Sequence, residues 1–366
     1  MFDEPSTKSM PKVAYDETLL SWMTRGVRQG KFLNNHLLAR ALEDLVLPVQ
    51  YWRPRGFEIQ SPEATLPDME FEPGENLLKL LSNTYELSKT AINQRFGSNG
   101  HWNTSIEYRT LYCRVCFDEA LTTTGGVVWK RSWCRATAAY CCLHGVPLSQ
   151  PLTRPEVIQR LDHVLLHHVR VKYDGYEEHV SRLCRNLTLR VQCWLQDVEC
   201  NRWGGVHIFG SPYNLIYAIL LSRRTVHARG GLATTSFGQK KISCHRSRLS
   251  FFQRLTQGIC ESDAVQRSGA LLIVGWLFGR ISTSEIEKAA IMEPRLGRLI
   301  TMSPKTLGRE AVVAVNNQEH YSMLELLSYF HNCDHPVFSD FFQGLCSYSF
   351  ARKSRSYAHR DGNAAV

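Results

Sequence analysis

Two pairs of possible metal ligands stand at short spacing in the middle of the chain. Cys113 and Cys116 form a Cys-x2-Cys pair, and Cys141 and His144 form a Cys-x2-His pair after 24 intervening residues. Each pair supplies two soft or borderline ligands from one tight turn, and a hairpin of this length brings the two turns together. Three thiolates and one imidazole complete the tetrahedral coordination of Zn²⁺, which leaves no position for a catalytic water. The spacing therefore predicts one structural zinc site.

Two further cysteines close to these pairs are alternative ligands. Cys142 is a competing third thiol, but only Cys141 gives a spacing that mirrors the first pair. Cys134 is a weaker competitor, because it stands between aromatic and basic residues on one arm of the expected hairpin. The alternative to a metal site is a set of buried free cysteines. We favour the metal site, because both short spacings coincide in a chain whose other thiols are scattered.

A second motif lies upstream, in residues 16–25, which read Asp-Glu-Thr-Leu-Leu-Ser-Trp-Met-Thr-Arg. The zinc stretch has a tyrosine before its first cysteine, a loop tryptophan at Trp133, a glycine after its histidine, and then Leu148. Both patterns resemble motifs of the TniQ/TnsD family of transposition proteins, whose N-terminal signature is E-S/T-L-x-S-W-x-x-R. They stand in the family's order, about 90 residues apart, and the resemblance covers about residues 10 to 150.

The resemblance implies a function in choosing where a transposon inserts. Family members recognise attachment-site DNA directly or dock on an RNA-guided Cascade complex, and they then recruit the element's AAA+ ATPase and transposase. One departure is that members often carry a second Cys-rich knuckle, whereas residues 149–183 contain no cysteine. This leaves a single zinc module and puts in doubt any function that depends on the second. The alternative is an unrelated zinc-stabilised DNA-binding transcription regulator that shares the knuckles.

The composition is that of a globular, basic protein. Its 366 residues are enough for two or three domains, and 43% of them are hydrophobic. The net charge of +9 suits a phosphate-rich partner such as DNA. Twelve cysteines without a secretory signal indicate a reduced compartment, so we expect a cytoplasmic protein. No apolar run reaches the roughly 18 residues that a membrane span needs, so we expect no membrane partner.

The periodicity of apolar residues predicts a mainly α-helical fold in three parts. We expect a helix-turn-helix-like N-terminal domain over residues 1–105, a zinc-binding module over 106–150, and a helical C-terminal domain over 151–366. A first helix should open at Asp16-Glu17-Thr18 and end at Gly30. Further helices are expected over residues 34–45, 75–81, 87–96, 155–169, 178–195, 269–278 and 284–291, with a short one from Ser303, and a proline-rich loop over 48–74.

A helix-turn-helix is the first candidate for contact with DNA. Its turn should lie at Asn83-Thr84, and Ser88 should cap its second helix. Polar side chains on that helix could reach base edges or phosphates, and the candidates are Lys89, Asn93, Gln94 and Arg95. The alternative is an ordinary helical hairpin with a solvated polar face.

A second candidate is a basic region in the C-terminal half. Its cations follow an apolar run and a glycine-rich loop, and the candidates are Arg223, Arg224, Lys240, Lys241, Arg246 and Arg248, with Arg254 close behind. Such charges position a protein on phosphates without reading sequence. A solvated face is the alternative. His163 and His167, four residues apart, are expected on a solvated helix face, because no third ligand stands near them.

The sequence lacks the patterns of several enzyme classes. It has no Gly-x4-Gly-Lys-Ser/Thr loop, no spaced acidic trio, no Gly-x-Ser-x-Gly elbow, and no activated Cys/His pair. We therefore expect a binding protein without catalytic residues. Its expected partners are DNA, the AAA+ ATPase and the transposase, and a Cascade complex with guide RNA or a homodimer is also allowed for.

Overall fold

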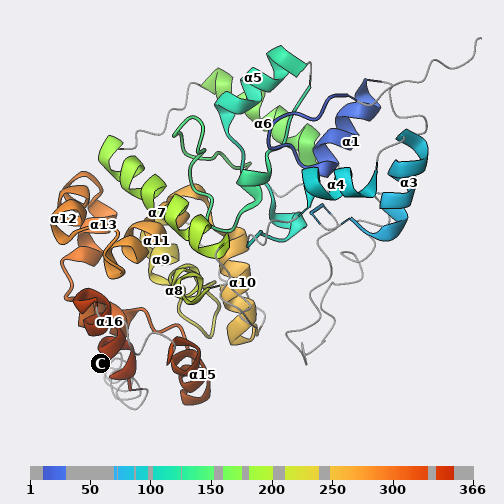
Figure 1. Ribbon diagram of the computed structural model, residues 1–366. Helices are drawn as coiled ribbons and strands as arrows, with labels where there is room; N and C mark the ends of the chain where they lie inside the picture. Colours follow the sequence, from blue (N-terminus) through green and yellow to red (C-terminus); the bar gives the residue numbers. More distant parts are fainter. Residues whose placement is uncertain are drawn as a thin grey trace, which may run out of the picture. The chain divides into compact units, whose positions relative to one another are not determined.

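The computed structural model describes residues 11–29, 70–71, 73–85, 88–97, 102–124, 126–151, 160–174, 181–200, 211–238, 248–328 and 335–349. This part of the chain is mainly helical, as the sequence predicts, and it contains isolated bridges but no strand (Figure 1). The chain divides into two compact units, Met1–Glu178 and His179–Val366. The N-terminal helices and the expected zinc ligands therefore lie in the same unit.

Three helices form the apolar core at the start of the first unit. They are α1 (Leu19–Arg28), α3 (Glu75–Tyr85) and α4 (Lys89–Phe96). The helix α1 opens directly after residues 16–18, as expected, and Thr18 caps it, because its side chain accepts a hydrogen bond from the backbone nitrogen of Ser21. Trp22 packs against Phe96, with ring centroids 5.4 Å apart. Leucines from α1 and α3 close the same core, so the three helices lie side by side (Figure 1).

The junction between α3 and α4 differs from the prediction. The turn expected at Asn83-Thr84 is helical, and α3 continues to Tyr85. The residues Asn83-Thr84 favour a turn locally, but tertiary packing overrides this preference. Leu77 and Leu81 keep one face of α3 in the core, so the helix continues past them. Ser88 caps α4 as predicted, since its side chain accepts from the backbone nitrogen of Ala91 at 3.1 Å. The helix expected over 34–45 and the loop over 48–69 lie outside the described residues.

The described remainder of the first unit includes two α-helices with an irregular segment between them. α5 (Arg114–Thr124) and α6 (Arg160–Asp174) flank residues 126–151. The irregular segment is tied by single bridges, one of which joins Tyr112 to Ser149. A buried aromatic cluster joins this segment to α5, with Trp129 and Trp133 from the segment, Phe117 from α5, and Tyr112 just before α5.

The second unit is a helical bundle around one apolar helix, α11 (Ala264–Leu277). The helices packed on it are α7 (Arg182–Cys200), α8 (Pro212–Leu221), α9 (Leu232–Phe237), α12 (Thr283–Met292) and α16 (Pro336–Cys346). Outside these, α10 (Phe251–Glu261) and α15 (Asn317–Leu327) pack on α8, α13 (Pro294–Ile300) packs on α12 and α9, and α14 (Pro304–Glu310) packs on α16. Asp263 and Gln266 form a capping box that starts α11 five residues before the expected boundary at Gly269. Ser282 caps α12, and Ser303 caps the short helix α14 that was predicted to start there. None of the described helices is long and apolar enough to cross a membrane.

Candidate metal centre

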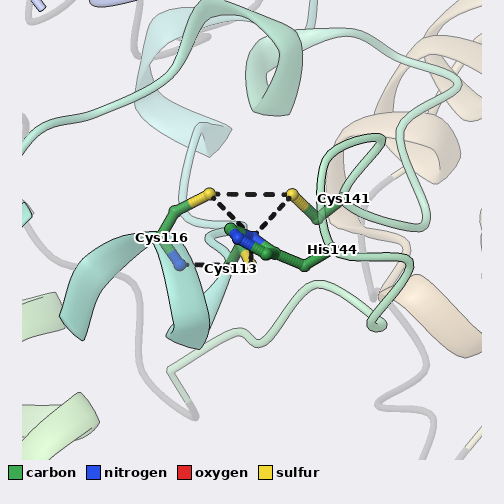
Figure 2. Close-up of side chains that lie close together, drawn as sticks. All are labelled: Cys113, Cys116, Cys141 and His144. Atoms are coloured by element: carbon green, nitrogen blue, oxygen red, sulfur yellow. Dashed lines mark hydrogen bonds between the residues drawn. The ribbon is translucent and has the colours of Figure 1, made fainter. Parts of the chain in front are cut away.

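The four expected ligands meet at one point in the first unit. The three sulfur atoms and the ring nitrogen of His144 all lie within 4.8 Å of one another, so the group could hold a metal ion. Nδ1 of His144 lies 3.6 Å from Cys113 Sγ, 3.2 Å from Cys116 Sγ and 3.7 Å from Cys141 Sγ. Figure 2 shows the cysteine side chains arranged around this ring. The Sγ atoms of Cys116 and Cys141 lie 3.7 Å apart.

The first pair of ligands is positioned by the start of α5. Cys113 immediately precedes the helix, and its sulfur accepts a weak hydrogen bond from the backbone nitrogen of Cys116 at 3.5 Å. Unpaired backbone N–H groups and the helix dipole make a helix N-terminus favourable for thiolates. The Cys-x2-Cys spacing therefore places both sulfurs at the end of α5 that best tolerates negative charge.

The second pair is positioned by a tight turn that needs a glycine. Gly145 has φ of 62°, a left-handed conformation that residues with a Cβ rarely adopt. Its backbone nitrogen donates to the carbonyl of Cys141 at 2.7 Å, and the nitrogen of Cys141 donates to Val146 at 2.9 Å. The turn brings the His144 ring back over the Cys141 sulfur, which explains why glycine follows the histidine.

Hydrogen bonds among the three crowded thiols shift their pKa values when no cation is present. Hydrogen bonds to Cys113 and Cys141, together with burial, raise the pKa of the Cys116 thiol. Hydrogen bonds from Cys113 and Cys116 lower the pKa of the Cys141 thiol. One sulfur thus holds negative charge at the expense of its neighbours, and a bound cation would allow all three to be thiolates.

Glu119 supports the histidine ligand, and the sequence analysis missed it. Its Oε1 lies 3.1 Å from Nε2 of His144, on the side of the ring opposite the sulfurs. A carboxylate in this position fixes the tautomer of a metal-binding histidine and increases its basicity. Its spacing could have identified it. Glu119 stands three residues after Cys116 on α5, and residues at this spacing are neighbours on the surface of a helix.

Two histidines fasten α6 to this centre. His168 is buried and its Nε2 lies 3.1 Å from Asp118 Oδ1, while His167 Nδ1 lies 3.0 Å from the Tyr112 hydroxyl. Burial is the main reason that the pKa of His167 is lowered. The expectation of a solvated histidine face is therefore wrong for His167. Its partner is 55 residues away in the chain, so no local pattern indicated the contact.

The upstream motif packs directly against the metal-binding stretch. The backbone nitrogen of Thr18 donates to the carbonyl of Trp129 at 2.9 Å, and the nitrogen of Trp129 donates to the Ser21 hydroxyl at 2.9 Å. Asp16 has φ of 58° and accepts from both the nitrogen and the hydroxyl of Ser132, at 3.1 and 2.6 Å. Residues 16–25 and residues 129–132 thus form one hydrogen-bonded structure. The latter segment, expected as one arm of a hairpin and called the hairpin arm below, forms a single bridge at Lys130 and then a 3-10 turn over Arg131–Cys134, with no strand.

A buried ion pair lies inside this structure. Arg25 Nη2 lies 2.6 Å from Glu17 Oε2, and both side chains are almost fully buried. Ser21 donates to the other carboxylate oxygen at 3.1 Å, and the backbone nitrogen of Ala14 donates to Oε2 at 2.8 Å. The glutamate, serine and arginine of the motif therefore satisfy one another's polar groups, as buried charges require.

Of the four residues on α4 that were predicted to contact DNA, three are exposed to solvent. Asn93, Gln94 and Arg95 are exposed, whereas Lys89 forms an ion pair with Glu75. Arg131 of the hairpin arm donates to the backbone carbonyls of Arg95 and Gly97, so the end of α4 is held against the metal-binding stretch.

The basic region is divided between exposed and buried cations. Arg224 and Arg248 are exposed, while Arg223 forms an ion pair with Glu261. Arg254 is buried and lies 2.7 Å from Glu319, so its role is in the core of the second unit. The remaining candidates Lys240, Lys241 and Arg246 lie outside the described residues.

The alternative thiol ligands do not join the centre. Cys142 is exposed, and the sulfur of Cys134 donates to the carbonyl of Lys130 at 3.6 Å. The donor group contains only the four residues favoured from spacing. Comparison of the chain with protein-family models, curated proteins and solved structures finds no match.

Proposed function

We propose that the metal is Zn²⁺ and that its role is structural. Zinc with Zn–S bonds of about 2.3 Å and Zn–N bonds of about 2.0–2.1 Å places sulfurs about 3.8 Å apart and sulfur about 3.6 Å from nitrogen at tetrahedral angles. The distances of 3.7 Å between Cys116 and Cys141, and of 3.6 and 3.7 Å from His144 to Cys113 and Cys141, agree with these edges, whereas the 3.2 Å from His144 to Cys116 is about 0.4 Å shorter than the tetrahedral edge. Four protein ligands leave no open position for catalysis.

We further propose that the chain selects the insertion target of a transposon, as its resemblance to TniQ/TnsD proteins implies. It would bind attachment-site DNA or an RNA-guided Cascade complex, and it would recruit the AAA+ ATPase and the transposase. The observation that supports this is the packing of the Glu17–Arg25 motif on the hairpin arm of the zinc stretch. Two motifs that resemble the same family, far apart in sequence, belong to one structural unit here.

This arrangement suggests how zinc could serve target selection. The metal holds the hairpin, the hairpin holds α1 through Ser21 and Trp129, and Arg131 holds the end of α4. α4 presents Asn93, Gln94 and Arg95 to solvent, where amide and guanidinium groups could reach base edges. Zinc would then act by positioning the exposed face of α4 for recognition of DNA. The protein itself would neither cleave nor join DNA strands.

The test is an insertion assay with sequencing of the insertion sites. An element that carries the wild-type gene should insert at a preferred target, and Cys116→Ser should abolish this preference. Cys142→Ser is the matched control, because its thiol is exposed and lies outside the donor group. Insertion that is unaffected by deletion of the gene would refute the proposal. Changed promoter activity in the deletion strain would then favour the transcription regulator.

A further inference from the structure

An exposed tyrosine with a cation over its ring stands at the edge of the first unit. The Tyr15 side chain is 76% exposed, and Lys130 Nζ lies 5.4 Å from its ring centroid. The same ammonium donates to the Tyr15 carbonyl at 2.8 Å. An ammonium has three donors, so this carbonyl leaves Lys130 able to bind a second acceptor. The pair therefore offers an aromatic surface and a positive charge at one point.

The backbone beneath this pair is unusually constrained. The neighbouring Asp16 has a left-handed φ of 58° and is held by both donors of Ser132. Its own carbonyl accepts from the backbone nitrogen of Arg131 at 2.7 Å. A strained non-glycine residue persists only where the surroundings enforce it, and such residues gather at functional sites. The constraint fixes the position of Tyr15 while its ring remains in solvent.

The charges around the pair favour an anionic ligand. The two segments 11–18 and 128–135 carry four cations at their surface or partly exposed, which are Lys12, Lys130, Arg131 and Arg135. Of their two carboxylates, Glu17 is paired with the buried Arg25, whereas Asp16 accepts from the neutral Ser132 and keeps its charge. Arg131 already donates to two backbone carbonyls, but the four cations still outnumber the one uncompensated carboxylate. The local charge therefore complements phosphate.

We propose that Tyr15 and Lys130 bind an unpaired nucleotide of DNA or RNA. The free face of the Tyr15 ring would stack on the base, and Lys130 would contact the phosphate beside it. Combining an aromatic platform with cations is how proteins bind single strands without reading sequence. The inside of a duplex does not offer a free base face, so the preferred ligand is single-stranded. The inference rests on the proposed function only in taking nucleic acid as a partner.

The test measures binding of fluorescent oligothymidylate and of a duplex of equal length to the full chain by anisotropy. Tyr15→Ala should weaken single-strand binding about 5- to 100-fold, the usual effect of losing one base stack, and Tyr15→Phe should stay within about twofold. Tyr321→Ala is the matched control, because Tyr321 is 70% exposed on α15 of the other unit. Lys130→Gln should reduce the log–log salt slope for single strands by about 0.7.

The inference is overturned if the wild-type protein does not bind oligothymidylate. It is also overturned if Tyr15→Ala and Tyr321→Ala bind oligothymidylate with equal affinity, or if Tyr15→Ala weakens binding to the duplex as much as binding to the single strand. Failure of target selection is a separate result, because it is read from insertion sites. A loss of single-strand binding in Tyr15→Ala would support the nucleotide site even if the element inserted without this protein.

Discussion

Ser21 on α1 accepts a hydrogen bond from the backbone nitrogen of Trp129 at 2.9 Å, across 108 residues of sequence. The Trp129 carbonyl in turn accepts from Thr18, so the start of α1 and the hairpin arm share two buried hydrogen bonds. The metal ligands Cys116 and Cys141 stand on either side of this arm in the sequence. Order in α1 should therefore depend on the metal.

The first prediction concerns removal of zinc. Chelation should increase amide hydrogen exchange in α1, because binding of the proposed Zn²⁺ would contribute folding energy to residues 126–151, against which α1 packs. α11 in the second unit is the internal control, and its exchange should stay unchanged. Mass spectrometry of peptides from both helices measures the effect. Equal protection of α1 with and without zinc would contradict the coupling.

The second prediction concerns the buried ion pair. Arg25→Ala should destabilise the first unit by about 3–5 kcal/mol, because Glu17 would remain buried and uncompensated. Arg28→Ala on the same helix is the control, since its pair with Asp162 is exposed and should contribute less than about 1 kcal/mol. Urea unfolding followed by tryptophan fluorescence would measure both. Similar losses in the two variants would show that the buried pair has no special role.

The third prediction concerns Glu119. Glu119→Ala should lower zinc affinity about 10- to 100-fold without loss of helix content, because His144 would lose the acceptor that orients its ring. Glu287→Ala, an exposed carboxylate in the second unit, should leave the affinity unchanged. Competition with a chromophoric chelator gives both values. An unchanged affinity in Glu119→Ala would mean that the carboxylate does not support the ligand.

The fourth prediction is that zinc affinity rises with pH. Hydrogen bonds to Cys113 and Cys141 and burial raise the pKa of the Cys116 thiol, so this thiol keeps its proton at neutral pH without metal. Zinc must displace that proton, so the apparent affinity should increase at least about tenfold per pH unit between roughly pH 6 and 8. The same competition assay tests this across pH. A constant affinity would show that the ligands are already deprotonated in the free protein.

Local spacing was enough to predict the metal-binding group. Cys113, Cys116, Cys141 and His144 meet because each pair occupies one turn, and such turns are specified by adjacent residues. Helix caps such as Thr18 and Ser88 were predictable for the same reason.

Contacts between distant segments were not predictable. Arg254 stands in a basic run, but it is buried because Glu319, 65 residues later, supplies a carboxylate. His168 lies against Asp118 across 50 residues, and this contact decides which face of α6 is covered. The periodicity of side chains indicates that a helix has an apolar and a polar face. It does not identify the distant residues that cover either face.

The central proposal, that this protein selects a transposon's target, is tested most directly by its binding to the AAA+ ATPase that the proposed transposon would encode. In the presence of ATP and target DNA, the zinc-loaded wild-type chain should retain the ATPase in a pull-down, and Cys142→Ser should do the same. Cys116→Ser should fail to retain it, because the unit that joins the two motifs would lose its metal. If the zinc-loaded wild-type chain does not retain the ATPase under any of these conditions, the result would contradict the proposed role in target selection.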